Sequence, residues 1–215
     1  MLIRQSLTKA IISYFLCSRF LTVLAVSREQ PPLCNGILQT VIIDFETDAD
    51  GNPYQAGDTP TSLPGGVGWV KGKRKHRGSE GADDAAMLFD TANPTGGDQD
   101  LYTADEKLVL IISEDNDASD PDDNRYGGLL RFNFKEPAYQ INSVEFLDID
   151  LANRGCKLVG KTTQGQELTG LLPRGGNGKL VTMDLDAWYD IEMLRVDFEG
   201  SGAVASVNLT QCAGT

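Results

Sequence analysis

The sequence predicts an all-β fold: a two-sheet antiparallel β-sandwich, jelly-roll-like, with about ten strands. From residue 38 onward, short apolar runs are separated by Gly, Pro, Asn and Asp, without a sustained helical periodicity. Several runs alternate, as in LLRFNF, where Leu130, Phe132 and Phe134 share one face. Asp outnumbers Glu by 21 to 10, and the short Asp side chain favours turns because it competes for local backbone hydrogen bonds.

Ten apolar or alternating runs are expected to form the strands. In chain order they are LQTVIIDF (38–45), AAMLFD (85–90), KLVLIIS (107–113), LLRFNF (129–134), YQINSVEFLDI (139–149), CKLVGKT (156–162), QELTGL (166–171), KLVTMDL (179–185), IEMLRVDF (191–198) and AVASVNL (203–209). Without helical crossovers, neighbouring strands should pair antiparallel. The longest stretch without a predicted strand runs from Asp48 to about Asp84, and a loop of that length is functional, mobile, or contains strands that the pattern does not reveal.

The first 27 residues have the pattern of a secretory signal peptide. Arg4 and Lys9 precede an apolar stretch that ends in small residues, and no acid occurs before Glu29. Arg19 interrupts this stretch, so an uncleaved anchor and a misassigned start are the alternatives. Cleavage is expected after Ser27, which makes the protein secreted and extracellular.

Cleavage would leave a lead-in (28–37) and one β-sandwich domain (38–212). It would also change the net charge from -12 to -15, because it removes three bases and no acid. This charge argues against a nucleic-acid partner, since phosphate would be repelled. No other segment approaches the roughly 20 apolar residues that span a bilayer.

Three cysteines follow the signal peptide. Cys34 and Cys212 are predicted to form a disulfide, because the two ends of a sandwich often lie side by side. Cys156 adjoins an apolar run and is interpreted as a core thiol in preference to a reactive one. Asn208 begins an Asn-Leu-Thr sequon and is a candidate glycosylation site if it faces solvent.

Three acid-rich segments follow or flank the predicted strands, and they suggest calcium. Calcium takes about six to eight oxygen ligands, whereas zinc needs nitrogen or sulfur that one His and scattered Cys cannot supply. Crowded carboxylates also repel one another unless water or a cation separates them. The alternative is a set of solvated loops that hold no metal. The candidate ligands are Asp44, Glu46, Asp48, Asp50, Asp90, Asp98, Asp100, Asp115, Asp117, Asp120, Asp122 and Asp123.

The tract from Lys71 to Gly78 contains five bases and the only histidine, His76. One interpretation is a solvated loop tip. The others are contact with a sulfated polysaccharide or another anionic surface, a processing site for a protease, and neutralisation of nearby acids. No nucleophile motif lies near His76, so Ser-His or Cys-His catalysis is not expected.

Exposed aromatic side chains would support a sugar-binding role. Trp69 is the preferred stacking candidate because it lies beside a Gly-rich turn and the basic tract, and Trp188 and Tyr126 are further candidate contacts. Trp188 and Tyr189 are adjacent, so they point to opposite faces of an extended chain and at least one belongs to the core.

Several blocks of the sequence, in order over about residues 40–209, resemble an extracellular β-sandwich module. The blocks are FDTANPTGGDQDL, LIISEDNDASDPDDNRYGGLLRFNF, SVEFLDID and GSGAVASVNL. The module occurs in bacterial surface-sorted proteins and in assorted secreted eukaryotic proteins, mostly of undescribed function. The resemblance implies a jelly-roll-like domain stabilised by calcium, similar in layout to carbohydrate-binding jelly rolls. The chain lacks the C-terminal hydrophobic anchor of the surface-sorted members.

Together these features predict a secreted, calcium-binding, non-catalytic module for adhesion or glycan recognition. An acidic matrix or biomineral-associated protein that gathers calcium at a surface is the alternative. A hydrolase of the glycosidase type is a weaker alternative, because the acids fall in metal-like clusters and not in evident catalytic pairs. The expected partner is an extracellular glycan, matrix or mineral surface.

Overall fold

Eleven strands and one short 3-10 helix form the described part of the computed structural model, which covers residues 31–76, 79–104, 108–149 and 155–214. The predicted signal peptide lies outside these residues. The elements are β1 (Ile37–Ile43), β2 (Val67–His76), β3 (Ser79–Asp83), β4 (Ala86–Asp90), η1 (Gln99–Leu101), β5 (Leu108–Ile112), β6 (Gly128–Leu147), β7 (Lys157–Thr162), β8 (Glu167–Leu171), β9 (Leu180–Asp184), β10 (Tyr189–Phe198) and β11 (Ala203–Ala213).

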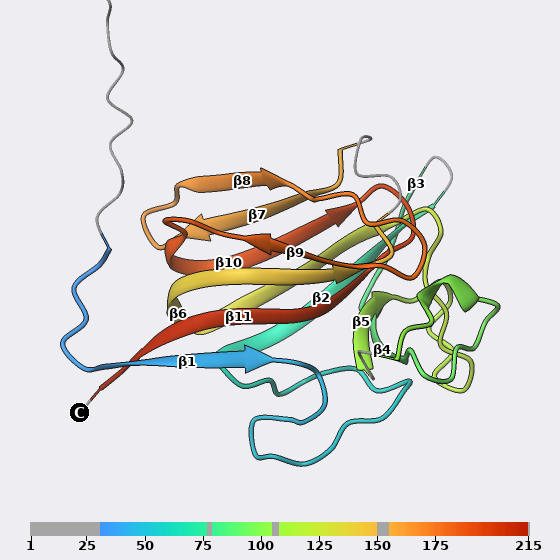
Figure 1. Ribbon diagram of the computed structural model, residues 1–215, viewed down its shortest axis with the longest axis horizontal. Coiled ribbons are helices and arrows are strands. Elements are labelled where there is room, and N and C mark those ends of the chain that lie inside the picture. The colour runs from blue at the N-terminus through green and yellow to red at the C-terminus, as the bar shows by residue number, and fades with distance from the viewer. Residues whose placement is uncertain (1–30, 77–78, 105–107, 150–154, 215) are drawn as a thin grey trace, which may run out of the picture.

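The strands build two packed antiparallel sheets, and β6 belongs to both (Figure 1). In its first half Phe132 pairs with Val70 of β2 and with Leu194 of β10. In its second half Val144 pairs with Val207 of β11 and with Met183 of β9. The first sheet therefore has the order β3-β2-β6-β10-β7-β8, and the second has the order β9-β6-β11-β1, with β5 and β4 attached to β11.

A proline marks the change of sheet within β6. Pro137 is exposed and lies between the two halves of the strand. Proline donates no backbone hydrogen bond, so it interrupts the ladder where the strand must bend. On the adjacent strand β10, the pairing register shifts between Ile191 and Met193. The sandwich predicted from the sequence is thus confirmed, and the runs 129–134 and 139–149 are one strand instead of two.

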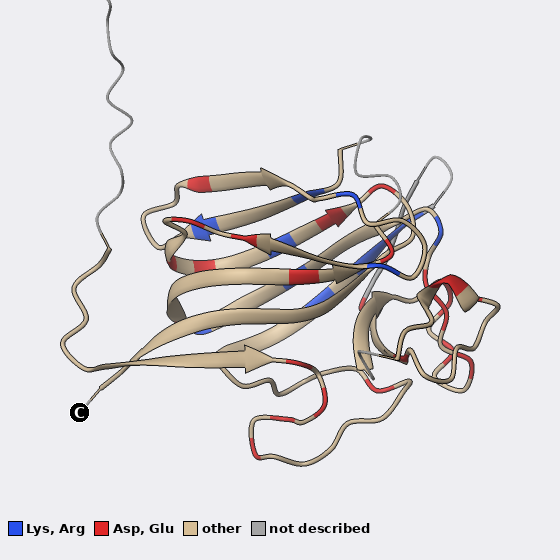
Figure 2. Ribbon diagram, in the orientation of Figure 1, with Lys and Arg blue, Asp and Glu red and all other residues tan. Residues whose placement is uncertain are grey.

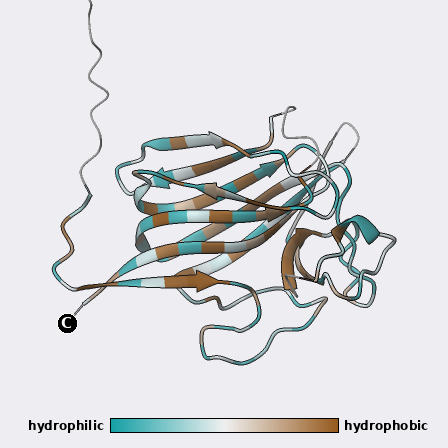
Figure 3. Cartoon of the chain, viewed as in Figure 1, coloured by the Kyte–Doolittle hydropathy of each residue, from teal (hydrophilic) through white to brown (hydrophobic). Residues whose placement is uncertain are grey.

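The main core lies between the two sheets. Along β6 buried and half-exposed residues alternate, and Figure 3 shows the same alternation of hydropathy on the long strands. Phe132 and Phe198 enter from the first sheet, and Phe146 enters from the second; all three are fully buried. Trp188 fills the space beside β7, where Gly160 leaves room for it: a Cβ on Gly160 would lie 2.8 Å from the indole ring.

Strand β5 differs from the other strands because both of its faces are buried. Leu110 and Ile112 pack into the main core, whereas Val109 and Ile111 pack into a smaller cluster that contains Leu101 of η1. All five residues of β5 are buried. This two-sided burial explains why the sequence LVLII is continuously apolar and does not alternate.

The basic tract is part of a strand, so the stretch between residues 48 and 84 contains strands that the sequence pattern did not reveal, which was one of the three alternatives. β2 and β3 both form in that stretch and pair with each other. The inner face of β2 carries Val70, Gly72 and Arg74, and the last two are not typical core residues, which hid the strand in the sequence. Gly72 is required there because a Cβ would lie 2.4 Å from the backbone nitrogen of Ala86. Interpretation of the tract as a loop tip is therefore incorrect for Lys71 to Lys75.

The predicted disulfide between Cys34 and Cys212 is confirmed, with a Cα–Cα distance of 5.7 Å. It joins the segment before β1 to the end of β11, whose residues pair along the whole of β1. Cys156 is buried in the main core, as expected, and its sulfur accepts a hydrogen bond from the Glu199 amide at 3.3 Å. No helix in the described ranges is long and apolar enough to cross a membrane.

Loss of the disulfide should lower stability without changing the fold. The bridge spans 178 residues of sequence, and closing so long a loop in the unfolded chain corresponds to about 5 kcal/mol in the chain-entropy model. The double variant Cys34→Ser, Cys212→Ser should therefore unfold at a lower urea concentration, with a loss of about 2–5 kcal/mol. Dithiothreitol should lower the midpoint of the wild type similarly and leave the variant unaffected; equal midpoints for oxidised wild type and variant would contradict this assignment.

Candidate functional site

Three rows of side chains cross the outer face of the first sheet, which we call the basic face. Each row takes one residue from each of β2, β6, β10, β7 and β8, and the pairing register places these residues next to one another. Neighbouring strands lie about 4.8 Å apart. The rows are Trp69, Asn133, Met193, Lys161, Glu167; Lys71, Arg131, Arg195, Val159, Thr169; and Lys73, Leu129, Asp197, Lys157, Leu171.

Positive charge is concentrated on the basic face although the chain as a whole is acidic. Its rows contain six Lys or Arg residues against the carboxylates Asp197 and Glu167, and Glu192 joins them at the bulge of β10, which gives a net charge of +3. The strands of the second sheet contain no Lys or Arg in β1, β9, β11 or the second half of β6 (Figure 2). The two outer faces of the sandwich therefore differ in charge.

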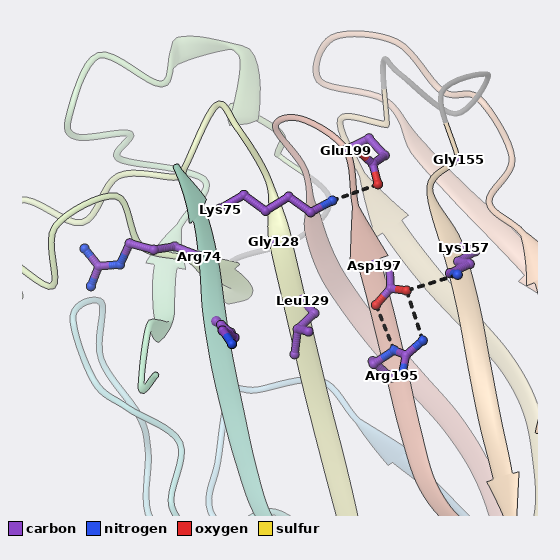
Figure 4. A pocket seen from close by; sticks show the side chains of 10 residues that line it. Arg74, Lys75, Gly128, Leu129, Gly155, Lys157, Arg195, Asp197 and Glu199 are labelled. Carbon is purple, nitrogen blue, oxygen red and sulfur yellow. Dashed lines mark hydrogen bonds and ion pairs between the residues drawn. The ribbon is translucent and has the colours of Figure 1, made fainter. Parts of the chain in front are cut away.

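Carboxylates pair with most of these cations. Asp197 lies between Arg195 and Lys157, with nitrogen–oxygen distances of 2.8 and 3.6 Å. At the end of the face Lys75 pairs with Glu199 at 2.7 Å. Figure 4 shows these side chains together on one side of the sheet, with Leu129 between them. The face thus presents hydrogen-bond donors and acceptors close to one another.

Two hollows lie on the basic face. One, of about 280 Å³, is lined by Lys73, Leu129, Lys157, Asp197 and neighbouring residues (Figure 4). The other, of about 380 Å³, is lined by Arg131, Asn133, Lys161, Glu192 and Met193. Both belong to the same sheet face, so one extended ligand could contact both.

The candidate aromatic contacts lie in different environments. Trp69 is 36% exposed on β2 and pairs in register with Asn133, which lines the second hollow. Tyr126 is equally exposed, in the turn before β6, and its hydroxyl accepts a hydrogen bond from Arg125. Trp188 is only 8% exposed and packs in the core, so it cannot present its ring face to a ligand.

The second and third acid-rich segments meet at one end of the sandwich. The Thr95 hydroxyl donates to the carbonyl oxygen of Pro121 at 2.6 Å, and the amide of Gly96 donates to Asp120 at 2.8 Å. The amide of Asp123 donates to Asp98 at 2.6 Å. Two segments separated by β5 in the sequence are therefore joined by direct hydrogen bonds.

Five carboxylates influence one another at this junction, and we call them the acidic cluster: Asp98, Asp100, Asp122, Asp123 and Asp148. Asp148 is fully buried and accepts hydrogen bonds from the Ser201 hydroxyl at 2.9 Å and the Gly178 amide at 3.2 Å. Asp123 is 5% exposed and accepts a hydrogen bond from the Gly202 amide. The sequence reasoning missed Asp148, whose only signal was an acid directly after an apolar strand.

Burial makes the acidic cluster resist ionisation. Burial, together with the neighbouring carboxylates, raises the pKa of Asp98 to about 7 and that of Asp123 to about 6. The same causes raise the pKa of Asp122, one of whose oxygens is buried without a hydrogen-bond partner. Asp98, Asp122 and Asp123 therefore hold a proton to higher pH than an exposed aspartate does.

Most of the other predicted metal ligands serve local turns, whereas Glu46 and Asp120 bind segments far away in the sequence. Asp48 accepts hydrogen bonds from Asp50 and Asn52, which lower its pKa, and Asp44 accepts one from Glu46. The Glu46 carboxylate accepts one from the Leu108 amide. Three further aspartates accept hydrogen bonds from residues at most three positions away. Asp90 accepts from Ala92 and Asn93, Asp115 from Asp117, and Asp117 from Ser119. Nowhere in the described ranges do three or more His, Cys, Asp or Glu side chains have an arrangement that could hold a metal ion.

The sequon asparagine lies on the outer face of the second sheet. Asn208 is half-buried on β11, and its side-chain oxygen accepts a hydrogen bond from Asn142 at 3.0 Å. Glycosylation at this position stays a prediction.

Comparison with known proteins yields distant structural similarities only. No protein-family model and no curated protein matches the chain. Among solved structures, two mutants of the carbohydrate-binding module CBM29-2, of family 29, match with TM-scores of 0.35 and 0.34 at 11% identity; the matches cover 83% and 82% of this chain and 93% of theirs. The family 32 module from C. perfringens NanJ, in complex with galactose, matches with a TM-score of 0.28 at 18% identity, over 40% of this chain and 67% of that one. Similarity this low carries no functional argument.

The raised pKa values predict that the fold is more stable at mildly acidic than at neutral pH. Both pKa values lie above the 3.8 of a free aspartate, so the folded state binds these protons more tightly than the unfolded state, and the stability they contribute is lost as pH rises through about 6 and 7. In EDTA the melting temperature should fall between about pH 5 and about pH 7.5. The variant Asp98→Asn should show a flatter dependence, whereas the exposed control Asp50→Asn should retain the wild-type slope. Identical slopes for all three proteins would refute the assignment.

Proposed function

We propose that this protein is a non-catalytic glycan-recognition module that binds its ligand on the basic face. The observation that carries the proposal is the pair of hollows on one sheet face, lined by both donors and acceptors and flanked by the exposed Trp69. An extended ligand can follow such a flat, rigid surface without a change in the backbone.

Sugar hydroxyls require partners of both kinds, because each can donate and accept a hydrogen bond. On the basic face Asp197 and Glu192 are acceptors, and Arg131 and Lys161 are donors. Asn133 offers both through its amide. These side chains belong to paired strands, which hold them in fixed positions and reduce the entropy lost on binding.

Trp69 supplies an apolar surface next to these polar groups. Its ring lies on the edge strand pair of the first sheet, and the Lys71 ammonium lies 5.7 Å from the ring centroid. A sugar ring that stacks on the indole would be within reach of that cation and of Asn133, its register partner. The three groups would then bind one sugar unit.

We further propose that the module acts outside the cell, in adhesion or matrix contact. A disulfide that fastens the two ends of the domain supports this location, because such bonds persist in oxidising compartments. The acidic loops repel anionic surfaces, which leaves the basic face for recognition.

A second candidate function is calcium binding at the acidic cluster, favoured by the buried carboxylates that meet there. Their oxygens suit a hard cation, and the buried Asp122 oxygen has no donor among the described residues. Binding requires that Asp98 and Asp122 rotate toward Asp123, since the present arrangement is not a metal site. Calcium would then hold the loops that follow β4 and β5 against each other.

The number of calcium ions bound distinguishes a protein with such a site from a mineral-facing polyanion. A built site saturates at one to a few ions and stabilises the fold. A polyanion gathers many ions weakly through exposed acids such as Asp50 and Asp117, with little change in stability.

Substitution of the exposed tryptophan should remove glycan binding while the fold remains intact. Trp69→Ala should weaken binding to a responding polysaccharide by at least about tenfold, equivalent to about 1.4 kcal/mol. Affinity electrophoresis against a panel of neutral and acidic polysaccharides measures this. Tyr102→Ala, which removes an aromatic ring that is 54% exposed but lies off the basic face, is the matched control. If no polysaccharide binds, or if both variants bind as wild type does, the proposed binding surface is wrong.

Calcium should raise the melting temperature in a saturable way. A ligand at a hundredfold excess over its Kd stabilises the folded state by about 2.7 kcal/mol, so melting in EDTA and in millimolar calcium should differ clearly. Asp123→Asn should abolish the difference, and Asp50→Asn should preserve it. An unchanged melting temperature for the wild type would exclude a calcium site and favour solvated or mineral-facing acidic loops.

A further inference from the structure

We infer that the glycan bound on the basic face is acidic and that the carboxylate of one of its sugars binds at Arg131. This inference rests on the proposed glycan recognition and assigns the chemical class of the ligand. It follows from the arrangement of charges around one residue at the centre of the face.

Arg131 is flanked by cations on both sides. Strand register places Lys71 of β2 and Arg195 of β10 directly opposite it. Like charges on directly opposite positions of neighbouring strands repel each other and destabilise a sheet. Three adjacent cations in one row therefore lower the stability of the folded state. Residues that lower stability in this way are typical of binding sites.

The two flanking cations have carboxylate partners, and the central one does not. Lys71 pairs with Asp84 at 3.7 Å, and Arg195 pairs with Asp197 at 2.8 and 3.2 Å. In the described part of the chain, Arg131 has no ion pair, and its buried Nε has no hydrogen-bond partner. A ligand that supplies the carboxylate that Arg131 lacks would therefore place it at the Arg131 guanidinium.

A carboxylate fits this position better than a neutral hydroxyl. The guanidinium group has a planar fork of donors that matches the two oxygens of a carboxylate, and the paired hydrogen bonds fix the orientation of the ligand. Arg131 is half-buried and lines the hollow beside Asn133 and Lys161. A sugar carboxylate seated there would have hydroxyl partners within the same hollow.

The charge density of the face favours a sparsely charged polymer. Asp197, Glu192 and Glu167 lie among the cations, and the net charge of the face is only +3 in a chain of net charge -12. Nucleic acid carries one charge per about 1.7 Å, and such a polyanion would meet these carboxylates along its length. A polysaccharide with at most one carboxylate per sugar can place its charges at the cations and its hydroxyls at the acids.

The test compares carboxylated polysaccharides with their own neutral forms. Polygalacturonate, alginate and hyaluronan would each be used as such and after methyl esterification of the carboxylates, together with neutral glucan and mannan and with dextran sulfate. At least one acidic polymer should bind at least about tenfold more tightly than its methyl ester, and added salt should weaken the binding of the acidic form.

The variant Arg131→Gln retains hydrogen-bonding capacity but removes the charge. The ratio of affinities for the acidic polymer and its ester should fall from at least about tenfold to near one. Arg174→Gln, at an exposed position in the loop after β8, should keep the wild-type ratio. Because the substitution relieves repulsion from Lys71 and Arg195, the melting temperature of Arg131→Gln should equal or exceed that of the wild type.

The outcomes separate this inference from the proposed function. Binding of a neutral glucan or mannan that is tighter than that of every acidic polymer would overturn the acidic ligand but leave glycan recognition standing. A preference for dextran sulfate, or an unchanged affinity ratio in Arg131→Gln, would overturn the assignment of a carboxylate to Arg131. No binding to any polymer would overturn both.

Discussion

The burial of β5 on both of its faces is the constraint from which much of this structure follows. One face of Leu108–Ile112 completes the main core, and the other would be open to water if the loops around it did not cover it. Leu101 of η1, in the segment that follows β4, packs against that second face together with residues of β4, β6 and β11. The segment that contains η1 is also in hydrogen-bond contact with the segment after β5, since the Asp123 amide donates to Asp98. The abrupt change from apolar to acidic sequence at Ser113 is therefore the change from a doubly buried strand to the loop that follows it.

The long strand β6 has a comparable effect on the opposite outer face of the sandwich. Because its two halves belong to different sheets, only the half before Pro137 contributes cations to the first sheet. The basic tract of β2 pairs with that half, and β7 and β10 add further cations beside it. A protein of net charge -12 thereby presents a surface of opposite sign, in which Arg131 lacks the carboxylate that its neighbours have. Under the proposed function, recognition would use this basic face of the fold.

The sequence was sufficient for the fold class, for nine of the strand locations and for the disulfide, because alternation and turn residues are local signals. It failed at β2, where Gly72 and Arg74 occupy inner positions that are normally apolar, and at β6, which was predicted as the two separate runs 129–134 and 139–149. The acidic clusters were visible, but which of their members converge depends on tertiary contacts between loops far apart in sequence. The row Lys71, Arg131, Arg195 could not be predicted at all, since strand register across β2, β6 and β10 is a long-range property.

Ligand is proposed to bind on the basic face of the first sheet, around Arg131. The most direct measurement is an NMR titration of the isotopically labelled protein with an oligosaccharide of the polymer that binds most tightly. The account predicts that the amide signals of Trp69, Arg131 and Met193 shift together with saturation, while those of β9, β11 and the acidic loops remain unchanged. Shifts confined to the second sheet or to the loops after β4 and β5 would contradict it.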